Sequence, residues 1–192
     1  MRGAIHAVRM TGPTSPDPRP ATRSAGTRSP TTAAFDHLPR PDAVAALLAV
    51  CSSPAWAEAV VDGRPYDELD ALLAAADAEL DRLDAGGISD ALAGHPRIGE
   101  RAIHSATSAR EQAGMSAAPD EVRAAVAEGN AEYERRFGHV YLVCASGRSA
   151  DELLAVLRER LGNTPEEEAR RTRAELAAIN RLRLTGLIVQ DR

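Results

Sequence analysis

The sequence predicts an all-α protein: a single-domain multi-helix bundle with one short extended connector. Three observations favour this fold class. Apolar residues recur at the i, i+3, i+4 spacing of a helix along most of the chain. Alanine and leucine are abundant, whereas aromatic residues make up only 3% of the sequence. One segment alone, 139–145, has the β-branched and aromatic composition of a strand, and because it lacks a neighbouring partner strand we expect a buried connector.

These signals place the helices in order along the chain. The first is expected to begin at Pro41, and the others cover 54–61, 69–83, 88–93, 119–137, 149–161 and 165–184. Gly86-Gly87 is expected to stop the helix that begins at Leu69. Two capping boxes, Ser149-x-x-Glu152 and Thr164-x-x-Glu167, mark the beginnings of the last two helices, because each side chain can satisfy a backbone N–H there.

The ends of the chain differ from its middle. Residues 1–33 hold five prolines and five arginines among Ser, Thr and Gly, without hydrophobic periodicity. Such a segment buries too little apolar surface to offset its ordering entropy, so we expect a disordered extension. It has no apolar run typical of a secretory signal, and its prolines exclude the amphipathic helix of a transit peptide. The helical domain is expected at 34–186, followed by a C-terminal tail at 187–192.

Composition argues against several classes of function. A net charge of −5 argues against nucleic-acid binding, which usually requires a basic face. No apolar run approaches the roughly 18–20 residues that span a bilayer, so no membrane partner is expected. Cys51 and Cys144 lie far apart and form no C-x-x-C motif, which favours a reducing compartment, the cytoplasm, and excludes the usual cysteine-based zinc site.

Lysine is absent from the chain. All 23 basic residues are arginine, so the protein can form no Schiff base with a carbonyl substrate or with pyridoxal phosphate, and it has no P-loop lysine. A G-x-G-x-x-G fingerprint is also missing, and nothing indicates a bound dinucleotide. Catalysis must therefore rely on other side chains.

His95 is the strongest catalytic candidate among the histidines. Gly94 is expected to free the backbone before it, and Pro96 disfavours α conformation at His95 itself. The histidine is therefore expected at a break between helices, presented by rigid flanks. The alternative is a loop histidine that only caps a neighbouring helix.

Two further polar features have both a structural and a functional interpretation. Ser108-x-x-Glu111 fits a capping box, but a cap also fixes Glu111 in one rotamer, as a functional site would. Arg183 lies on the same helix face as Leu176 and Ile179. It can extend along that face to solvent, or it stays inside and needs an anion from the protein or from a ligand.

Five short motifs then connect the chain to a known family. They are Gly94-His95-Pro96-Arg97-Ile98-Gly99-Glu100, Ser108-x-x-Glu111-Gln112-Ala113-Gly114, Asn130-x-x-Tyr133-x-x-Arg136-Phe137-Gly138, the Tyr141–Ala145 run, and Ile179-x-x-Leu182-Arg183-Leu184. From about Phe35 to Leu184 the chain resembles the 2-oxo-4-hydroxy-4-carboxy-5-ureidoimidazoline (OHCU) decarboxylases of urate breakdown. It departs from them at His139-Val140, where Phe-Pro is common, and at Ser146, where an arginine often stands.

The resemblance implies an all-helical homodimer, without cofactor or metal, that converts OHCU to (S)-allantoin and CO2. Carried over by position, it implies His95 as the catalytic acid/base, with Glu111 orienting His95 or holding the ureido group. It implies contacts to this small-molecule ureidoimidazoline from Pro96, Ser108, Ala109, Arg110, Glu111, Gln112, Tyr141, Leu142, Val143, Cys144, Ala145 and Arg183.

The chemistry of OHCU suits such a chain. Its ring C=N, beside the carboxylated carbon, can take up the electron pair of decarboxylation, a task for which enzymes usually employ a cofactor or a lysine. Two other functions stay open: a catalytically silent helical interaction module, and a metal-dependent hydrolase that uses His95, His104 and Glu111. No H-x-x-x-H or H-E-x-x-H pair supports the metal site.

Overall fold

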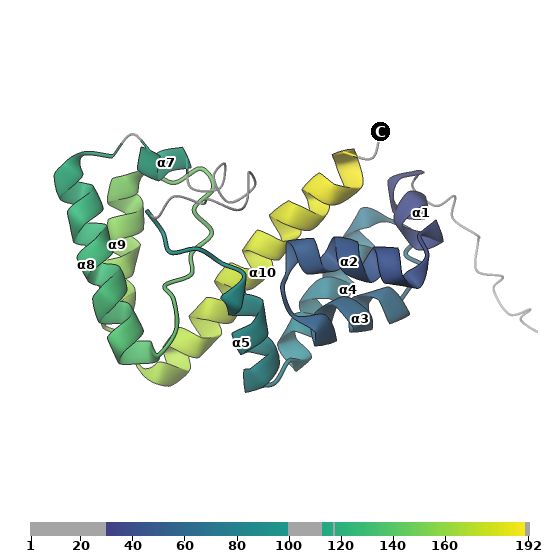
Figure 1. Ribbon diagram of the computed structural model, residues 1–192, viewed down its shortest axis with the longest axis horizontal. Helices are drawn as coiled ribbons and strands as arrows, with labels where there is room; N and C mark the ends of the chain where they lie inside the picture. The colour runs from purple at the N-terminus through teal and green to yellow at the C-terminus, as the bar shows by residue number, and fades with distance from the viewer. Residues whose placement is uncertain (1–29, 100–112, 117, 191–192) are drawn as a thin grey trace, which may run out of the picture.

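The computed structural model describes residues 30–99, 113–116 and 118–190, and within these ranges the chain is all-helical apart from its loops, as predicted (Figure 1). Its helices are α1 (Pro30–His37), α2 (Arg40–Val50), α3 (Pro54–Asp62), α4 (Leu69–Arg82), α5 (Ala85–Ala93), α7 (Ala113–Ser116), α8 (Asp120–Phe137), α9 (Ala150–Arg160) and α10 (Pro165–Gln190). Helices α1–α4 form one group and α7–α9 another. The long helix α10 runs from the second group to the first, with α5 between them (Figure 1).

Local sequence signals explain several helix ends. Ser149 Oγ accepts from the Glu152 backbone N–H at 3.3 Å, and the Glu152 carboxylate accepts from the Ser149 N–H at 2.7 Å. Thr164 and Glu167 form the second predicted capping box in the same way. Helix α8 ends at Gly138, whose φ of 78° lies in the left-handed region that glycine adopts at little cost.

The prediction that Gly86-Gly87 stops the preceding helix is wrong. Helix α4 ends at Arg82, and the glycine pair lies in the first turn of α5, where the Asp84 side chain accepts from the Gly87 N–H at 2.8 Å. A Cβ on Gly87 would lie 2.9 Å from Cδ2 of Leu83. Glycine therefore lets the first turn of α5 pack closely against Leu83, and the pair does not break either helix.

The described helices extend beyond the predicted domain limits at both ends. Helix α1 begins at Pro30, inside the segment predicted to be an extension, and the side chains of Thr32 and Phe35 are buried. The sequence places the end of the final helix at 184, but α10 continues to Gln190. The added turns are stabilised by Ile188, which is buried in the core.

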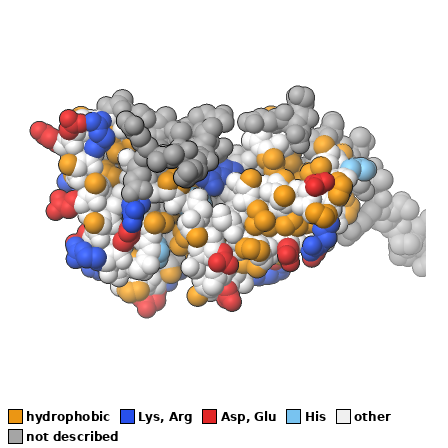
Figure 2. Space-filling model, viewed as in Figure 1, with side chains coloured by type: hydrophobic (Ala, Val, Ile, Leu, Met, Phe, Trp, Pro, Cys, Tyr) orange, Lys and Arg blue, Asp and Glu red, His pale blue; other side chains and the backbone are white. Residues whose placement is uncertain are grey.

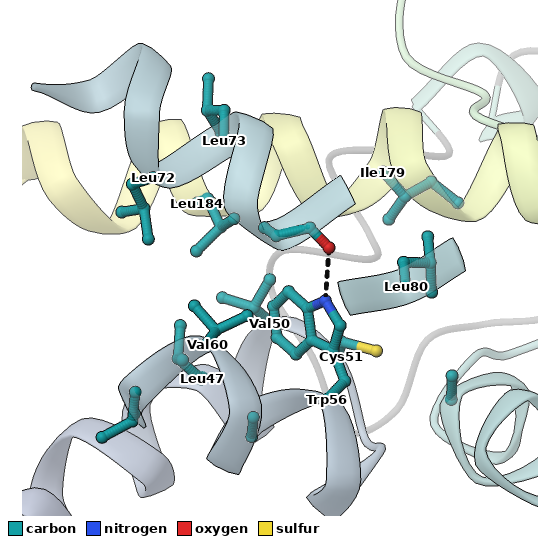
Figure 3. Close-up of a cluster of buried hydrophobic side chains, with 14 of the residues drawn as sticks. Leu47, Val50, Cys51, Trp56, Val60, Leu72, Leu73, Leu80, Ile179 and Leu184 are labelled. Carbon is teal, nitrogen blue, oxygen red and sulfur yellow. Dashed lines mark hydrogen bonds between the residues drawn. The ribbon is translucent and has the colours of Figure 1, made fainter. Parts of the chain in front are cut away.

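The larger hydrophobic core lies between α1–α5 and α10 (Figure 3). Trp56 of α3 is fully buried in it, and its indole N–H donates to the Ala76 carbonyl of α4 at 2.9 Å, the dashed line in Figure 3. Leaving that donor unpaired would cost about 1–3 kcal/mol. The buried hydroxyl of Tyr66 also has a hydrogen-bond partner, because it donates to the Val60 carbonyl at 2.6 Å. Burial raises the pKa of Tyr66 to about 12.

A second core lies between α8, α9 and the extended connector, and a buried ion pair borders it. Arg160 at the end of α9 and Glu168 on α10 are 2% and 1% exposed, and Arg160 Nε donates to Glu168 Oε1 at 2.8 Å. Tyr133 of α8 donates its hydroxyl to the same carboxylate. Burial opposes the charge on Glu168, but the hydrogen bonds from Arg160 and Tyr133 lower its pKa nonetheless. This network, absent from the sequence predictions, joins α8, α9 and α10.

Charged side chains of both signs are distributed over the surface. On the face shown in Figure 2, acidic and basic side chains are interspersed, and hydrophobic side chains gather over the half built from α1–α4. Ion pairs such as Arg40–Asp62 at 3.1 Å and Arg181–Asp77 at 2.5 Å contribute to this pattern. None of the described helices is both long and apolar enough to cross a membrane.

Candidate active site

His95 lies at a break between helices, as the sequence predicts. Helix α5 ends at Ala93, and the backbone N–H of His95 donates to the Leu92 carbonyl at 3.0 Å, which closes the last turn. Residues 95–97 are not helical. His95 is only 8% exposed, yet it lines a pocket. Its side chain is therefore placed where a small molecule could reach it and bulk water is largely excluded.

Gly94 brings this break against the loop between α2 and α3. A Cβ on Gly94 would lie 1.9 Å from Oγ and 3.0 Å from Cβ of Ser52. The φ of Gly94 is −82°, a value that other residues also adopt. The predicted conformational role of Gly94 is therefore wrong, and glycine is favoured here because a side chain would meet the side chain of Ser52.

Two contacts with α8 hold the segment that follows His95. Arg97 donates through Nε and Nη2 to the two carboxylate oxygens of Glu134, at 2.5 and 2.8 Å. This hydrogen-bonded pair lowers the pKa of Glu134, and its two parallel bonds fix its geometry. One residue further on, the Ile98 carbonyl accepts from Asn130 Nδ2 at 2.9 Å. The histidine loop thus lies against Ser52 on one side and is held by α8 on the other.

The extended connector is present as predicted, at residues 141–145. Its side chains alternate between the two cores: Tyr141, Val143 and Ala145 belong to the second core, whereas Leu142 and Cys144 pack in the first. Alternation of this kind is the pattern of an extended chain. The Tyr141 hydroxyl donates to the Leu153 carbonyl at 3.4 Å, and burial raises its pKa, so it stays protonated at neutral pH.

One pocket collects the described candidate residues. It is lined by His95, Pro96, Ile98, residues 141–146, Ile179, Leu182 and Arg183, and its void, including the open mouth, is about 380 Å³. Arg183 is half-buried, and its Nη1 donates to the Val50 carbonyl at the end of α2 at 3.0 Å. Arg183 therefore contributes a positively charged side chain to the pocket lining.

The structure therefore brings together His95, Pro96, Tyr141–Ala145 and Arg183. The other predicted site residues, Ser108, Ala109, Arg110, Glu111 and Gln112, lie outside the described residues, and so does His104 of the alternative metal site. Ile98, Ser146, Ile179 and Leu182 line the pocket without having been predicted. Ile179 could have been predicted to line the pocket from its i, i+4 spacing to Arg183 on the same helix face. In the part of the chain that the structure describes, no group of three or more His, Cys, Asp or Glu side chains could hold a metal ion.

Comparison with known proteins identifies the family. Residues 36–185 match the family described as OHCU decarboxylase. The chain belongs to the OHCU decarboxylase family. A 2-oxo-4-hydroxy-4-carboxy-5-ureidoimidazoline decarboxylase from Amia calva is 31% identical over 141 residues, which cover 70% of this chain and 81% of the relative. The predicted family is confirmed.

Two further proteins are similar to this chain, one in sequence and one in fold. The uric acid degradation bifunctional protein TTL of Arabidopsis thaliana is 29% identical over 144 residues, which cover 71% of this chain but only 43% of the plant protein. This chain thus spans less than half the length of that relative. A crystal structure of OHCU decarboxylase in the presence of (S)-allantoin matches with a TM-score of 0.65 at 24% identity, over 74% of this chain and 96% of the other. The match confirms the all-α fold class.

Proposed function

We propose that this protein decarboxylates OHCU to (S)-allantoin and CO2 in urate breakdown. One observation carries the proposal: His95, Pro96, the connector and Arg183, which are distant in sequence, meet at one pocket in a chain of the OHCU decarboxylase family. The name of the Amia calva relative states this activity, and the name of the Arabidopsis relative refers to uric acid degradation.

The substrate itself supplies the electron sink for the reaction. When the bond to the carboxylate carbon breaks, CO2 leaves and the electron pair moves into the neighbouring ring C=N. The hydroxyl then loses its proton to become a carbonyl, while the ring nitrogen and the ureido-bearing carbon each gain one. The sum is loss of CO2 and uptake of one proton. This route needs neither a cofactor nor a lysine amine, in agreement with a lysine-free chain.

His95 is the proposed proton-transfer group. It either accepts the hydroxyl proton or donates to the ureido-bearing carbon, and a positioned acid or base of this kind contributes about 10²–10⁴-fold. His95 is nearly buried, and α8 holds the loop that carries it. This placement restricts the face of the substrate ring that His95 can reach. Free OHCU gives racemic allantoin, so the chirality of the product reports on this placement.

The other site residues bind and orient the substrate in this proposal. Arg183 pairs with negative charge on the substrate. The backbone and side chains of Tyr141–Ala145, together with Pro96, surround the ring and the ureido group. From the family resemblance, residues 108–112 complete the site, and Glu111 orients His95 or accepts from the ureido N–H groups.

Assembly and location are proposed alongside the activity. We propose a homodimer, on the strength of the family resemblance, and sedimentation of the purified protein distinguishes it from a monomer. The cysteine usage supports a cytoplasmic location, which fractionation of the source cells tests.

The deciding experiment gives freshly generated OHCU to the purified protein and follows CO2 release and the circular dichroism of allantoin. We expect protein-dependent formation of (S)-allantoin that a chelator does not inhibit. His95→Asn should abolish it with helical content and Tm nearly unchanged. Racemic allantoin at the uncatalysed rate would overturn the proposal and favour the interaction module, whereas inhibition by the chelator would favour a metal-dependent hydrolase.

A further inference from the structure

The backbone of the connector is held by two buried charged side chains from different helices. Arg160 at the end of α9 donates through Nη1 to the Leu142 carbonyl at 2.6 Å. Glu175 on α10 accepts from the Cys144 N–H at 2.9 Å through Oε2. Both Leu142 and Cys144 line the pocket with His95. Two adjacent points of the pocket wall are thus fixed by groups outside the pocket lining.

These two contacts lie on the same edge of the connector. In an extended chain, the backbone groups of residues i and i+2 point to one edge and those of residue i+1 to the other. The Leu142 carbonyl and the Cys144 N–H therefore face one edge, toward Arg160 and Glu175. The N–H and carbonyl of Val143 face the opposite edge. Holding one edge fixes which backbone groups the other edge presents to a ligand.

The carboxylate of Glu175 is itself held as a hydrogen-bond acceptor. It is 6% exposed, and its Oε1 pairs with Arg171 at 2.9 Å, one helical turn earlier on α10, and with Arg148 at 3.9 Å. Arg171 is 47% exposed. Arg171 and Arg148 compensate for the negative charge of Glu175, which would otherwise repel the anionic substrate of the nearby pocket. Oε2 is left to hold the connector.

We propose that Glu175 is a positioning residue for the decarboxylation: it fixes the connector through the Cys144 N–H, with Arg160 fixing the neighbouring Leu142 carbonyl. The inference rests on the proposed function. Glu175 does not line the pocket, so it acts through the backbone that does. It is a better probe than Arg160, because Arg160 also forms the buried pair with Glu168 and its loss endangers the fold.

Four variants separate the connector contact from charge and from stability. Glu175→Leu removes the acceptor. Glu175→Asp keeps the charge but withdraws the oxygens by about 1.5 Å, one bond length. Glu175→Gln keeps an amide oxygen that can accept from the Cys144 N–H. Arg171→Gln is the matched control, because it removes an exposed partner of Glu175 and leaves the connector contact in place.

Each variant is assayed with OHCU below its Tm for kcat, KM and the enantiomeric excess of allantoin. We expect Glu175→Leu and Glu175→Asp to lower kcat/KM at least tenfold and to reduce the enantiomeric excess. Glu175→Gln should stay within about fivefold of wild type and Arg171→Gln within twofold. A role in stability alone would lower Tm but leave the enantiomeric excess of the folded enzyme unchanged.

The outcomes that contradict the inference are distinct from those that contradict the proposed function. Wild-type kinetics and enantiomeric excess in folded Glu175→Asp would overturn the positioning role, even if Glu175→Leu does not fold. Equal damage in Glu175→Gln and Glu175→Leu would also overturn it, because charge and not the Cys144 contact would then matter. An inactive wild-type protein would instead refute the decarboxylase function.

Discussion

Substitution of Gly94 by alanine tests whether the His95 loop is set by its contact with Ser52. The new Cβ would lie 1.9 Å from Ser52 Oγ, whereas heavy atoms in favourable contact are about 3.5 Å apart. With the Ser52 side chain kept in its present rotamer, one of the two loops must move by about 1.6 Å. Because α8 holds the segment after His95 through Arg97, part of this movement has to be taken up at the histidine itself.

The expected effect on activity is larger than the effect on stability. Overpacking of this kind costs about 1–3 kcal/mol, which corresponds to a fall in Tm of roughly 2–12 °C for a protein of this size. Displacement of a catalytic group by about 1 Å costs on the order of 100-fold in rate. We therefore expect Gly94→Ala to lower kcat/KM for OHCU by about 100-fold, measured as (S)-allantoin formation well below Tm, with thermal unfolding followed separately.

A second substitution supplies the control. Ser52→Ala removes Oγ, and the alanine at position 94 then meets only the Cβ of residue 52 at 3.0 Å, a contact that a shift of a few tenths of an ångström relieves. The double variant should recover most of the lost activity, and Ser52→Ala alone should behave as wild type. Wild-type kcat/KM and Tm in Gly94→Ala, or a double variant no better than Gly94→Ala, would refute the steric explanation.

Three other substitutions follow from the fold and the site. Glu168→Gln should lower the free energy of unfolding by about 3–5 kcal/mol at pH 7, because Arg160 loses its buried partner. The pKa of Glu168 is lowered in the folded protein, so its charge stabilises the fold above the unfolded pKa, and this stabilisation is lost as the pH falls through the folded pKa. The difference in Tm between wild type and variant should therefore shrink in acid. A difference in Tm that does not depend on pH would contradict this. Trp56→Phe removes the donor to the Ala76 carbonyl and leaves a cavity in the core, so it should cost at least about 1 kcal/mol in urea unfolding, while an unchanged midpoint would show that neither the bond nor the lost packing stabilises the fold. Glu111→Gln can still complete a capping box, so we expect an unchanged Tm with kcat/KM lowered more than tenfold; near-normal kinetics would leave capping as its whole role.

Features that depend on neighbours in sequence were predictable. The Ser149–Glu152 box forms because both partners lie within one helical turn, and Gly138 ends α8 because its φ of 78° suits glycine. The connector was recognisable from its composition, and the break at His95 from Pro96. These predictions require only the local preferences of the backbone.

Features that depend on distant contacts were not predictable. A side chain at position 94 would meet Ser52, but Ser52 lies on another loop, and its position beside Gly94 depends on the packing of the fold. Arg160 and Glu175 look like ordinary charges on helix surfaces, and only the packing of α9 and α10 around the connector buries them. A charged residue in a sequence is expected at the surface, because the partner that compensates for its burial is not apparent from neighbouring residues.

Helix α10 has a consequence for how the chain folds during synthesis. Its Leu176 and Leu184 complete the first core, and its Glu168 binds Arg160 and Tyr133 in the other half of the molecule. The ribosome makes both halves before it makes this helix. Neither half can then reach its final packing while α10 is still in the exit tunnel, and their apolar faces stay exposed for that interval, when a nascent chain is most prone to aggregation and to chaperone binding. Synonymous codons that slow translation between α9 and α10 should therefore reduce the yield of folded protein more than slow codons placed earlier in the chain.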